Sequence, residues 1–295
     1  MEKKNLLFRA LGRLITKAYP YLPDELALRL FFKHYVGYPL NLDNPKSFNE
    51  KLQWLKIHDI HPEYTKMVDK IEAKKYVASI IGDKYIIPTL KVYNSVDEID
   101  WNELPDQYVM KTNHGCGRMI IARDKSKVNV EEAKEMLKKA LKRDYCKYNR
   151  EYPYKNVVRR VFVEKYMEDE TGELRDFKFF CFGGKPYCLF VASDRSKKDT
   201  ETKFDFYDMD WNLLPFTNGH PNSGKKMEKP KSFELMKQLA EKLSAGIPHV
   251  RVDFYNINGD IYFGELTFFH WSGTVPFEPV EWDYKLGEMI QLPKE

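Results

Sequence analysis

The chain has 295 residues, of which 43% are hydrophobic and 15% aromatic, so it can bury a large core in two or three lobes and is not a disordered protein. Its net charge of +4, from 48 Lys and Arg against 44 Asp and Glu, is small and both signs are mixed along the chain, which does not favour nucleic acid as a partner. No apolar run reaches the roughly 18 residues of a membrane helix, and basic residues interrupt the apolar N-terminus, unlike in a signal peptide. We therefore expect a cytoplasmic protein.

The first 82 residues are predicted to be mainly helical. A helix ending at Ala18 carries an apolar stripe, which favours packing on the protein's own domain over contact with a membrane surface. The stripe consists of Leu6, Leu7, Ala10, Leu11 and Leu14. A second helix is predicted over 24–34. A third begins in SFNEKLQWLK, where Ser47 and Glu50 form a capping box, and a fourth covers 65–81 and ends at Gly82.

From residue 85 the pattern changes to short strands, YIIPTLKVY, QYVMKTN and MIIARD, followed by a helix over 130–142 and the strand VVRRVFVEKYM. The turn VMKTNHGCGRMII joins the second and third strands. Its glycines, Gly115 and Gly117, can expose backbone amides to phosphate oxygens, with Lys111 as a point charge and Arg118 as a clamp. Taken alone, the turn favours a hairpin without a ligand.

Charged residues also interrupt the next apolar strands. Glu164 lies in VFVEKYM, and Asp176 and Lys178 share one face of the strand DFKFF because strand side chains alternate. This pair indicates either an ordinary exposed acid and base or a phosphate contact by Lys178. Gly183-Gly184 marks the hairpin turn that follows.

Residues 194–230 are polar and rich in turn formers, which is typical of a working loop. Arg195 in this loop is a candidate for binding an anionic substrate, on its charge and location alone. The stretch FYDMDW at 206–211 contains D-M-D, but Trp211 and its neighbours are typical of a strand and a turn, which argues against a glycosyltransferase metal motif. A helix is predicted over 232–243, and the tail over 274–295 is expected to wrap the surface.

The segment VRVDFYNINGDIYFGELTFFHW, residues 250–271, alternates on both sides of Asn258-Gly259 and predicts a β-hairpin. A two-residue turn would point Glu265 to the face opposite Asp253. A three-residue loop would set Arg251 opposite Glu265 and bring Asp253 diagonally beside it. The acids then form either a salt bridge with Arg251 or a shared ion site.

In chain order, these pieces resemble the ATP-grasp superfamily. The resemblance begins at DKIEAKKYVASIIGDKYIIP, continues through VMKTNHGCGRMII, FVEKYM and RDFKFF, and ends at R-x-D-F and G-E-L-T, which is similar to the family's metal-binding R-x-D and E-x-N. It covers residues 69–273. PKSFNEKLQWLK, DFKFFCFGGKP and ELTFFHWSG look most similar to the TupA-like branch, which is associated with teichuronopeptide synthesis and surface-polysaccharide gene clusters.

The resemblance implies an α+β ATP-grasp fold in which two subdomains clamp ATP between antiparallel sheets. The implied parts are a helical N-terminal region over 1–65, a pre-grasp segment over 66–105, a lid subdomain over 106–166 and a C-terminal subdomain with the metal-binding hairpin over 167–295. The residues implied to contact ATP are Lys111, Gly115, Gly117, Arg118, Glu164, Lys165, Tyr166 and Lys178. Glu164 and the backbone of Lys165 and Tyr166 would hold the adenine.

The same resemblance assigns Mg2+ to Asp253 and Glu265, and it assigns to Arg251, with Lys178, the stabilisation of the transferring phosphoryl group or tetrahedral intermediate. The implied reaction activates a carboxylate as an acyl phosphate, which an amine then attacks to form an amide. Thr267 stands where the family pattern has asparagine, which puts a second metal in doubt.

The expected partners are an acidic small molecule, sugar or polymer and an amine donor, in cell-surface polysaccharide synthesis. Contact of the N-terminal region with a membrane or a biosynthetic complex stays open. Three alternatives also remain: a kinase acting on a sugar or polyol hydroxyl, a polysaccharide-cluster glycosyltransferase, and a non-catalytic nucleotide sensor.

Overall fold

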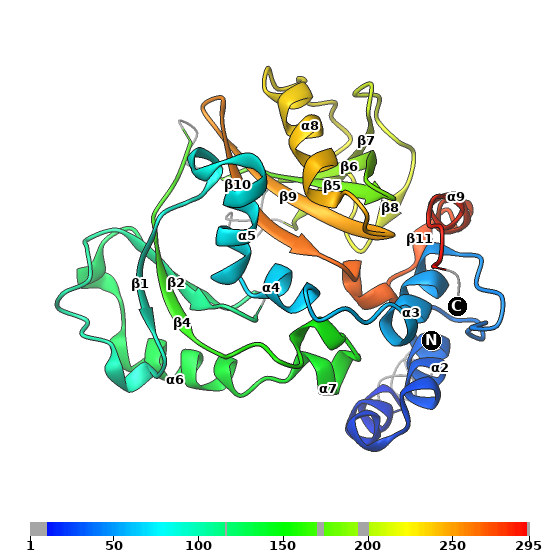
Figure 1. Ribbon diagram of the computed structural model, residues 1–295, viewed down its shortest axis with the longest axis horizontal. Helices are drawn as coiled ribbons and strands as arrows, with labels where there is room; N and C mark the ends of the chain where they lie inside the picture. The colour runs from blue at the N-terminus through cyan, green and yellow to red at the C-terminus, as the bar shows by residue number, and fades with distance from the viewer. Residues whose placement is uncertain (1–10, 116, 170–173, 194–200, 294–295) are drawn as a thin grey trace.

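The computed structural model describes residues 11–115, 117–169, 174–193 and 201–293. Two antiparallel sheets, one of four strands and one of five, form the body, and helices pack beside them (Figure 1). This arrangement confirms the expected α+β fold with a helical N-terminal region. Among the described residues, no helix has the length and apolar character needed to cross a membrane.

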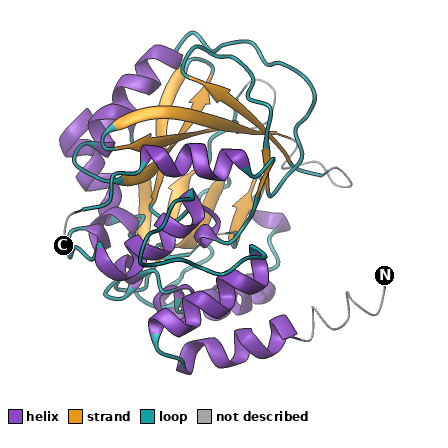
Figure 2. Cartoon of the chain, turned by 90° about the vertical axis from the view of Figure 1, so that its right-hand side faces the viewer, coloured by secondary structure: helices purple, strands orange, loops and turns teal. Residues whose placement is uncertain are grey.

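The N-terminal helices lie along one edge of the molecule, which is the lower edge in Figure 2. Residues 11–18 are helical, and a short turn, η1 (Tyr19–Tyr21), leads to α2 (Asp24–Tyr35). The next helix, α3 (Phe48–His58), begins with the predicted capping box. Ser47 Oγ accepts from Glu50 N–H at 3.2 Å, and the Glu50 carboxylate accepts from Ser47 N–H at 3.1 Å.

The single helix predicted over 65–81 is wrong, because the chain breaks between α4 (Tyr64–Val68) and α5 (Glu72–Ile81). The Asp69 carboxylate accepts hydrogen bonds from the N–H groups of Ile71 (2.9 Å) and Glu72 (3.3 Å), as an N-terminal cap does. Between the two helices, Lys70 N–H donates to Asn113 O at 2.9 Å. Asp69 therefore lies at the end of one helix and caps the start of the next, and Lys70 lies in the break between them.

The four-stranded sheet has the order β1-β4-β2-β3, with every neighbouring pair antiparallel. Its strands are β1 (Thr89–Tyr93), β2 (Tyr108–Thr112), β3 (Met119–Ala122) and β4 (Val161–Lys165). It has its own small hydrophobic core, to which the helix α6 (Val130–Leu141) contributes Leu137. The other elements of this region are η2 (Asp83–Tyr85), η3 (Val96–Glu98), η4 (Lys125–Lys127), α7 (Tyr145–Asn149) and η5 (Tyr152–Tyr154).

The five-stranded sheet has the order β10-β9-β5-β6-β7 and is also antiparallel. Its strands are β5 (Asp176–Phe182), β6 (Lys185–Ser193), β7 (Lys203–Asp208), β9 (His249–Ile257) and β10 (Asp260–Thr267). The helix α8 (Phe233–Ser244) packs on one face, where the rings of Phe233 and Phe179 stack with centroids 5.9 Å apart. The opposite face of these strands is the one that carries charged residues.

The hairpin β9–β10 combines features of both turns considered from the sequence. Its turn has two residues, Asn258 and Gly259, both with positive φ (54° and 101°), so the three-residue loop is wrong. A β-bulge at Gly264 then shifts the register by one residue, so that Asp253 lies directly opposite Glu265 and Arg251 opposite Thr267. The bulge, and not the turn length, brings the two acids to the same face.

The tail does run over the surface, but it also contains a helix that the sequence analysis did not predict. β11 (Phe277–Glu278) pairs with β8 (Thr217–Asn218), and α9 (Glu281–Met289) packs against α3. The contact is close at Gly287, where an added Cβ would lie 2.2 Å from Lys46 O. The C-terminal helix is therefore packed on the N-terminal helical region.

We expect Gly287→Ala to lower the free energy of unfolding by about 1–3 kcal/mol, because the methyl group overlaps backbone atoms that cannot move independently. Urea unfolding of the full chain measures the change. The control is Glu288→Ala, an exposed substitution at the next residue of α9, which should leave stability within about 0.5 kcal/mol of wild type. Equal stability of the two variants would contradict the close packing of α9 on α3.

Candidate functional site

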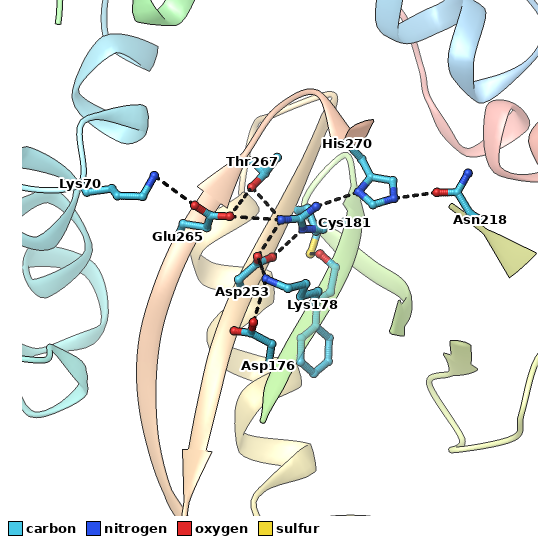
Figure 3. Close-up of polar contacts among 11 residues, drawn as sticks. Lys70, Asp176, Lys178, Cys181, Asn218, Asp253, Glu265, Thr267 and His270 are labelled. Carbon is cyan, nitrogen blue, oxygen red and sulfur yellow. Dashed lines mark hydrogen bonds and ion pairs between the residues drawn. The ribbon is translucent and has the colours of Figure 1, made fainter. Parts of the chain in front are cut away.

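The three adjacent strands β10, β9 and β5 direct charged side chains to one face of the five-stranded sheet (Figure 3). In the register of the sheet, Lys178 lies opposite Asp253, and Asp253 lies opposite Glu265. The cluster, here called the acid–base face, consists of Lys70, Asp176, Lys178, Arg251, Asp253, Glu265 and Thr267. Strand alternation and the Gly264 bulge together place the side chains of the strands side by side, and Lys70 reaches Glu265 from the break between α4 and α5.

Arg251 is the centre of the acid–base face. Its Nε and Nη2 donate to the two oxygens of Asp253, each at 2.7 Å, in a bidentate pair. Nη2 also donates to Thr267 Oγ1 at 3.0 Å and to Glu265 Oε1 at 3.3 Å. Burial alone would lower the pKa of Arg251, but the charges of Asp253 and Glu265 raise it, so the guanidinium stays charged. The side chains of Arg251 and Asp253 are only 9% and 1% exposed.

Two lysines balance the remaining negative charge. Lys178 Nζ pairs with Asp253 and lies 3.5 Å from Asp176 Oδ2, and Lys70 Nζ lies 3.2 Å from Glu265 Oε2. Burial would raise the pKa of Glu265, but the charges of Lys70, Lys178 and Arg251 hold it well below its usual range. Three cations therefore face three carboxylates, and this balance offsets the cost of burying each charge.

His270 forms a hydrogen bond with Arg251, and the hydrogen bonds around His270 define the tautomer of its ring. Asn218 Nδ2 donates to Val275 O and Pro276 O, both at 3.0 Å, so Asn218 Oδ1 is an acceptor and lies 2.8 Å from His270 Nε2. His270 Nε2 must then carry the proton, and Nδ1 accepts from Arg251 Nη1 at 2.7 Å. Burial and the charge of Arg251 hold the pKa of His270 well below 6.5. His270 thus positions the arginine.

The turn after His270 has a strained backbone that α3 holds in place. Trp271 and Ser272 have φ values of 49° and 54°, which are unfavourable for residues with a side chain. Gln53 Nε2 donates to Ser272 O at 3.0 Å, and Lys56 Nζ donates to the same oxygen at 2.9 Å. Glu151 accepts from Ser272 Oγ at 2.8 Å. Helix α3 is therefore a structural support of the acid–base face.

A second charged cluster lies on the four-stranded sheet around Glu164. Lys74 Nζ and Lys111 Nζ each lie 2.6 Å from a different oxygen of this buried carboxylate. Burial would raise the pKa of Glu164, but the two ammonium groups lower it. Both ammonium groups also lie 5.4 Å from the centre of the Phe162 ring. With two cations for one anion, this cluster has a net positive charge.

The glycine-rich turn follows this cluster along the chain. Gly117 has φ 71°, whereas Gly115 is required by space, because a Cβ there would lie 2.6 Å from Thr112 Oγ1. Arg118 is exposed. At the end of β4, Lys165 is exposed and its N–H donates to Pro88 O at 3.0 Å, and Tyr166 Oη donates to Glu168 at 2.6 Å. Arg195 lies outside the described residues.

Lys70 connects the two charged clusters. Its side chain reaches Glu265, while its N–H donates to Asn113 O, in the segment that leads from β2 into the glycine-rich turn. Asn113 is in turn held by Arg160 and Val158, whose backbone groups bond to its side-chain amide at 2.8 Å. The strand leading to the turn and the acid–base face are thus fixed relative to each other.

Sequence analysis assigned no role in these clusters to three residues, Lys70, Lys74 and His270. The signal for the lysines lay in the quoted stretch DKIEAKKY, which contains both, but a continuous helix over 65–81 would have concealed the special position of Lys70. The hydrogen bond from Arg251 to His270 joins residues 19 apart across a turn, and no local pattern predicts it.

The D-M-D sequence forms a turn, as the sequence analysis expected. β7 ends at Asp208, whose Oδ1 accepts from the N–H groups of Asp210 (2.9 Å) and Asn212 (2.8 Å). Trp211 has φ 65° and its side chain is buried. Asp208 therefore caps this turn.

The acid–base face has donors that suit Mg2+. The described residues contain no group of three or more His, Cys, Asp or Glu that could enclose a metal alone. Asp253 and Glu265 nevertheless lie directly opposite each other, and one or two carboxylates are what Mg2+ uses when phosphate and water oxygens complete its shell. The ammonium group of Lys70 contacts Glu265 and that of Lys178 contacts Asp253. A divalent cation bound to these carboxylates would therefore compete with the two lysines.

Comparison with known proteins gives a family match. A family model described as TupA-like ATPgrasp matches residues 50–291. A search of curated proteins found no match. Among solved structures, the chain is similar to D-alanine–D-alanine ligase from Bacillus anthracis in complex with ATP (16% identity, TM-score 0.40), covering 69% of this chain and 54% of that one.

Two further structures show similar levels of likeness. D-alanine–D-alanine ligase from Helicobacter pylori has 15% identity and a TM-score of 0.43, with 84% of this chain and 70% of that one covered. N5-carboxyaminoimidazole synthase from Aspergillus clavatus has 14% identity and a TM-score of 0.42, with 79% and 54% covered. The chain spans only about half the length of the first solved structures that it resembles.

We expect His270→Leu to lower the free energy of unfolding by about 1–3 kcal/mol, because a buried N–H of Arg251 and the buried Asn218 Oδ1 both lose their partner. His270→Gln, which offers an oxygen and an N–H group, should recover part of this loss. Urea unfolding at pH 8 measures both variants. Equal stabilities of the leucine variant and wild type would contradict the assigned hydrogen bonds.

The pH dependence of stability supplies an independent check on His270. Because the pKa of His270 is lowered in the folded protein, the unfolded chain binds a proton below about pH 6.5 that the folded chain does not. Stability should therefore decrease as the pH falls from 7 to 5, and the decrease should be smaller in His270→Gln. An identical slope in both proteins would show that His270 titrates normally when folded.

Proposed function

The chain belongs to the TupA-like ATP-grasp family, and from this premise we propose that it is an ATP- and Mg2+-dependent ligase that joins a carboxylate to an amine. The observation that carries the proposal is the presence of two charged clusters whose relative position is held by Lys70. One is the acid–base face, and the other is the lysine-rich cluster around Glu164. One cluster suits a metal and a reacting phosphoryl group, and the other suits polyphosphate.

We assign the binding of the ATP phosphates to Lys111 and Lys178, with the turn that contains Gly115, Gly117 and Arg118 as the cover. Lys74 joins this set because it shares Glu164 with Lys111. The net positive charge of the Glu164 cluster supports a polyanionic ligand. The adenine would lie against the end of β4, at Glu164, Lys165 and Tyr166.

We assign the metal to Asp253 and Glu265. Mg2+ bound there would neutralise phosphate charge and orient the γ-phosphate for transfer. Arg251 donates hydrogen bonds to the oxygens that gain negative charge, and His270 with Asn218 fixes the plane of its guanidinium. Thr267 Oγ1 already accepts a hydrogen bond from Arg251 Nη2, which favours one bound metal ion over two at this site.

The proposed chemistry has two steps. An oxygen of the substrate carboxylate attacks the γ-phosphorus, the bond to the β-phosphate oxygen breaks, and ADP leaves with an acyl phosphate formed. The amine nitrogen then attacks the acyl carbon, the bond from this carbon to the phosphate oxygen breaks, and inorganic phosphate leaves with the proton that the nitrogen loses as the amide forms. Closure of the glycine-rich turn over the site would exclude water, which would otherwise hydrolyse the acyl phosphate.

We further propose that the carboxylate belongs to an acidic sugar or peptide used in cell-surface polysaccharide synthesis, in a reaction on the cytoplasmic side. The support is the family membership alone. The turn formed by D-M-D disfavours the glycosyltransferase alternative, since Asp208 is engaged as a cap. A kinase that transfers phosphate to a hydroxyl would use the same two clusters. Experiment must therefore distinguish this activity from ligation.

Glu265→Gln should abolish the Mg2+ dependence of ATP binding and weaken binding by at least about tenfold, since a metal ligand is replaced by a neutral amide of the same shape. Isothermal titration of wild type and variant, with and without Mg2+, measures this. The matched control is Glu281→Gln, an exposed acid on α9. Wild-type protein that does not bind ATP with Mg2+ would refute the proposed function.

Hydroxylamine should trap the acyl phosphate. With ATP, Mg2+ and a panel of uronic acids and acidic dipeptides, the ligase should release ADP and form a hydroxamate, which iron(III) reveals by colour. Arg251→Lys should reduce the rate by at least about a hundredfold, because the bidentate guanidinium is lost. ADP release that needs a hydroxyl acceptor and yields no hydroxamate would instead identify a kinase.

A further inference from the structure

The net positive charge of the protein is concentrated at its N-terminus. Residues 1–18 contain five basic residues and one acidic residue, a net charge of +4 that equals the net charge of the whole chain. The rest of the chain is therefore neutral overall. The basic residues are Lys3, Lys4, Arg9, Arg13 and Lys17, and the last three are spaced four residues apart, as on one side of a helix.

The helix of residues 11–18 packs on α2 through the side that carries Gly12. Gly12 is buried, and a Cβ added there would lie 2.7 Å from His34 Nε2. Leu11 and Leu14 point away from this contact and are 53% and 65% exposed. The expectation that the apolar stripe packs on its own domain is therefore wrong for these two residues. The other members of the stripe, Leu6, Leu7 and Ala10, lie outside the described residues.

Other large apolar side chains are exposed on the segment that follows this helix. Tyr21 is 81% exposed, and Leu26 and Leu30, one turn apart on α2, are 46% and 39% exposed. Arg13 and Lys17 are also exposed, beside Leu14. The N-terminal pair of helices thus presents large apolar side chains together with cations, whereas the supports of the acid–base face begin only at α3.

We propose that the N-terminal helix binds the surface of an anionic lipid bilayer, with Leu11 and Leu14 inserted among the acyl chains and Arg13 and Lys17 at the headgroups. Basic amphipathic helices bind such surfaces by apolar burial and electrostatic attraction together. A second copy of the chain is disfavoured as the occupant, because it would bring another net charge of +4 against this one.

Co-sedimentation of the full chain with vesicles tests the proposal. Binding is expected to vesicles of phosphatidylcholine with 30% phosphatidylglycerol, to weaken steeply from 0.1 to 0.5 M NaCl, and to be at least about tenfold weaker to pure phosphatidylcholine. Arg13→Glu/Lys17→Glu should lower binding by at least about tenfold, since each basic residue near an anionic surface contributes roughly fivefold. Leu11→Ser/Leu14→Ser should lower it similarly.

Matched control variants at α8 distinguish binding through the N-terminal helix from a general effect of net charge or exposed apolar residues. Lys231→Glu/Lys242→Glu makes the same change in net charge on exposed residues at and near α8, and Leu235→Ser removes an exposed leucine from that helix. Both should bind as wild type does. In Leu14→Trp the indole fluorescence should shift to the blue on binding, whereas in Leu235→Trp it should not.

Three outcomes would overturn the proposal: no binding to anionic vesicles, equal binding to neutral ones, or equal loss in the α8 controls. Light scattering that shows a dimer broken by Leu11→Ser/Leu14→Ser would identify the stripe as a contact between copies instead. ATP titration of the same variants should match wild type, because the helix lies outside both charged clusters. Membrane binding and the proposed ligase activity can thus fail independently.

Discussion

The buried ion pair between Arg251 and Asp253 is the constraint on which the rest of the site depends. An arginine and an aspartate with 9% and 1% exposed side chains are tolerated only if every charge and every donor has a partner. Lys178, Glu265 and Thr267 supply those partners from adjacent strands, and His270 supplies the last one. Features remote in sequence, such as the bulge at Gly264 and the helix break at Lys70, are explained by this requirement.

Local elements could be predicted from the sequence because their signals are local. The capping box at Ser47, the helix over 130–141 and the Gly183-Gly184 turn each depend on residues within a few positions of one another. The charged residues in the apolar strand DFKFF also indicated correctly that Asp176 and Lys178 share one face. Strand alternation is sufficient for that inference.

What could not be predicted depends on partners distant in the chain. The Gly264 bulge is selected by the pairing of Asp253 with Glu265, and the break at Asp69 by contacts of Lys70 with Asn113 and Glu265. A continuous helix and a regular hairpin satisfy the local pattern equally well. The functional residues missed by sequence analysis are accordingly those whose position is fixed by tertiary contacts.

The N-terminal region has two parts with different relations to the site. Helix α3 supports the strained turn at Trp271 and Ser272 through Gln53 and Lys56, so it belongs to the site as much as the strands do. The helix of residues 11–18 makes no comparable contribution and carries two exposed cations, Arg13 and Lys17. Its residues can change without disturbing the buried ion pair, whereas those of α3 cannot.

The support of the turn by α3 also determines when the site can form during synthesis. The hydrogen bond from Gln53 to Gly273 joins residues 220 positions apart. At about 5–20 residues per second, a ribosome needs roughly 10–45 s to make the intervening chain. During that time Phe48, Leu52 and Leu55, all buried in the folded protein, lack their C-terminal partners. The site is therefore completed only after nearly the whole chain has emerged from the ribosome.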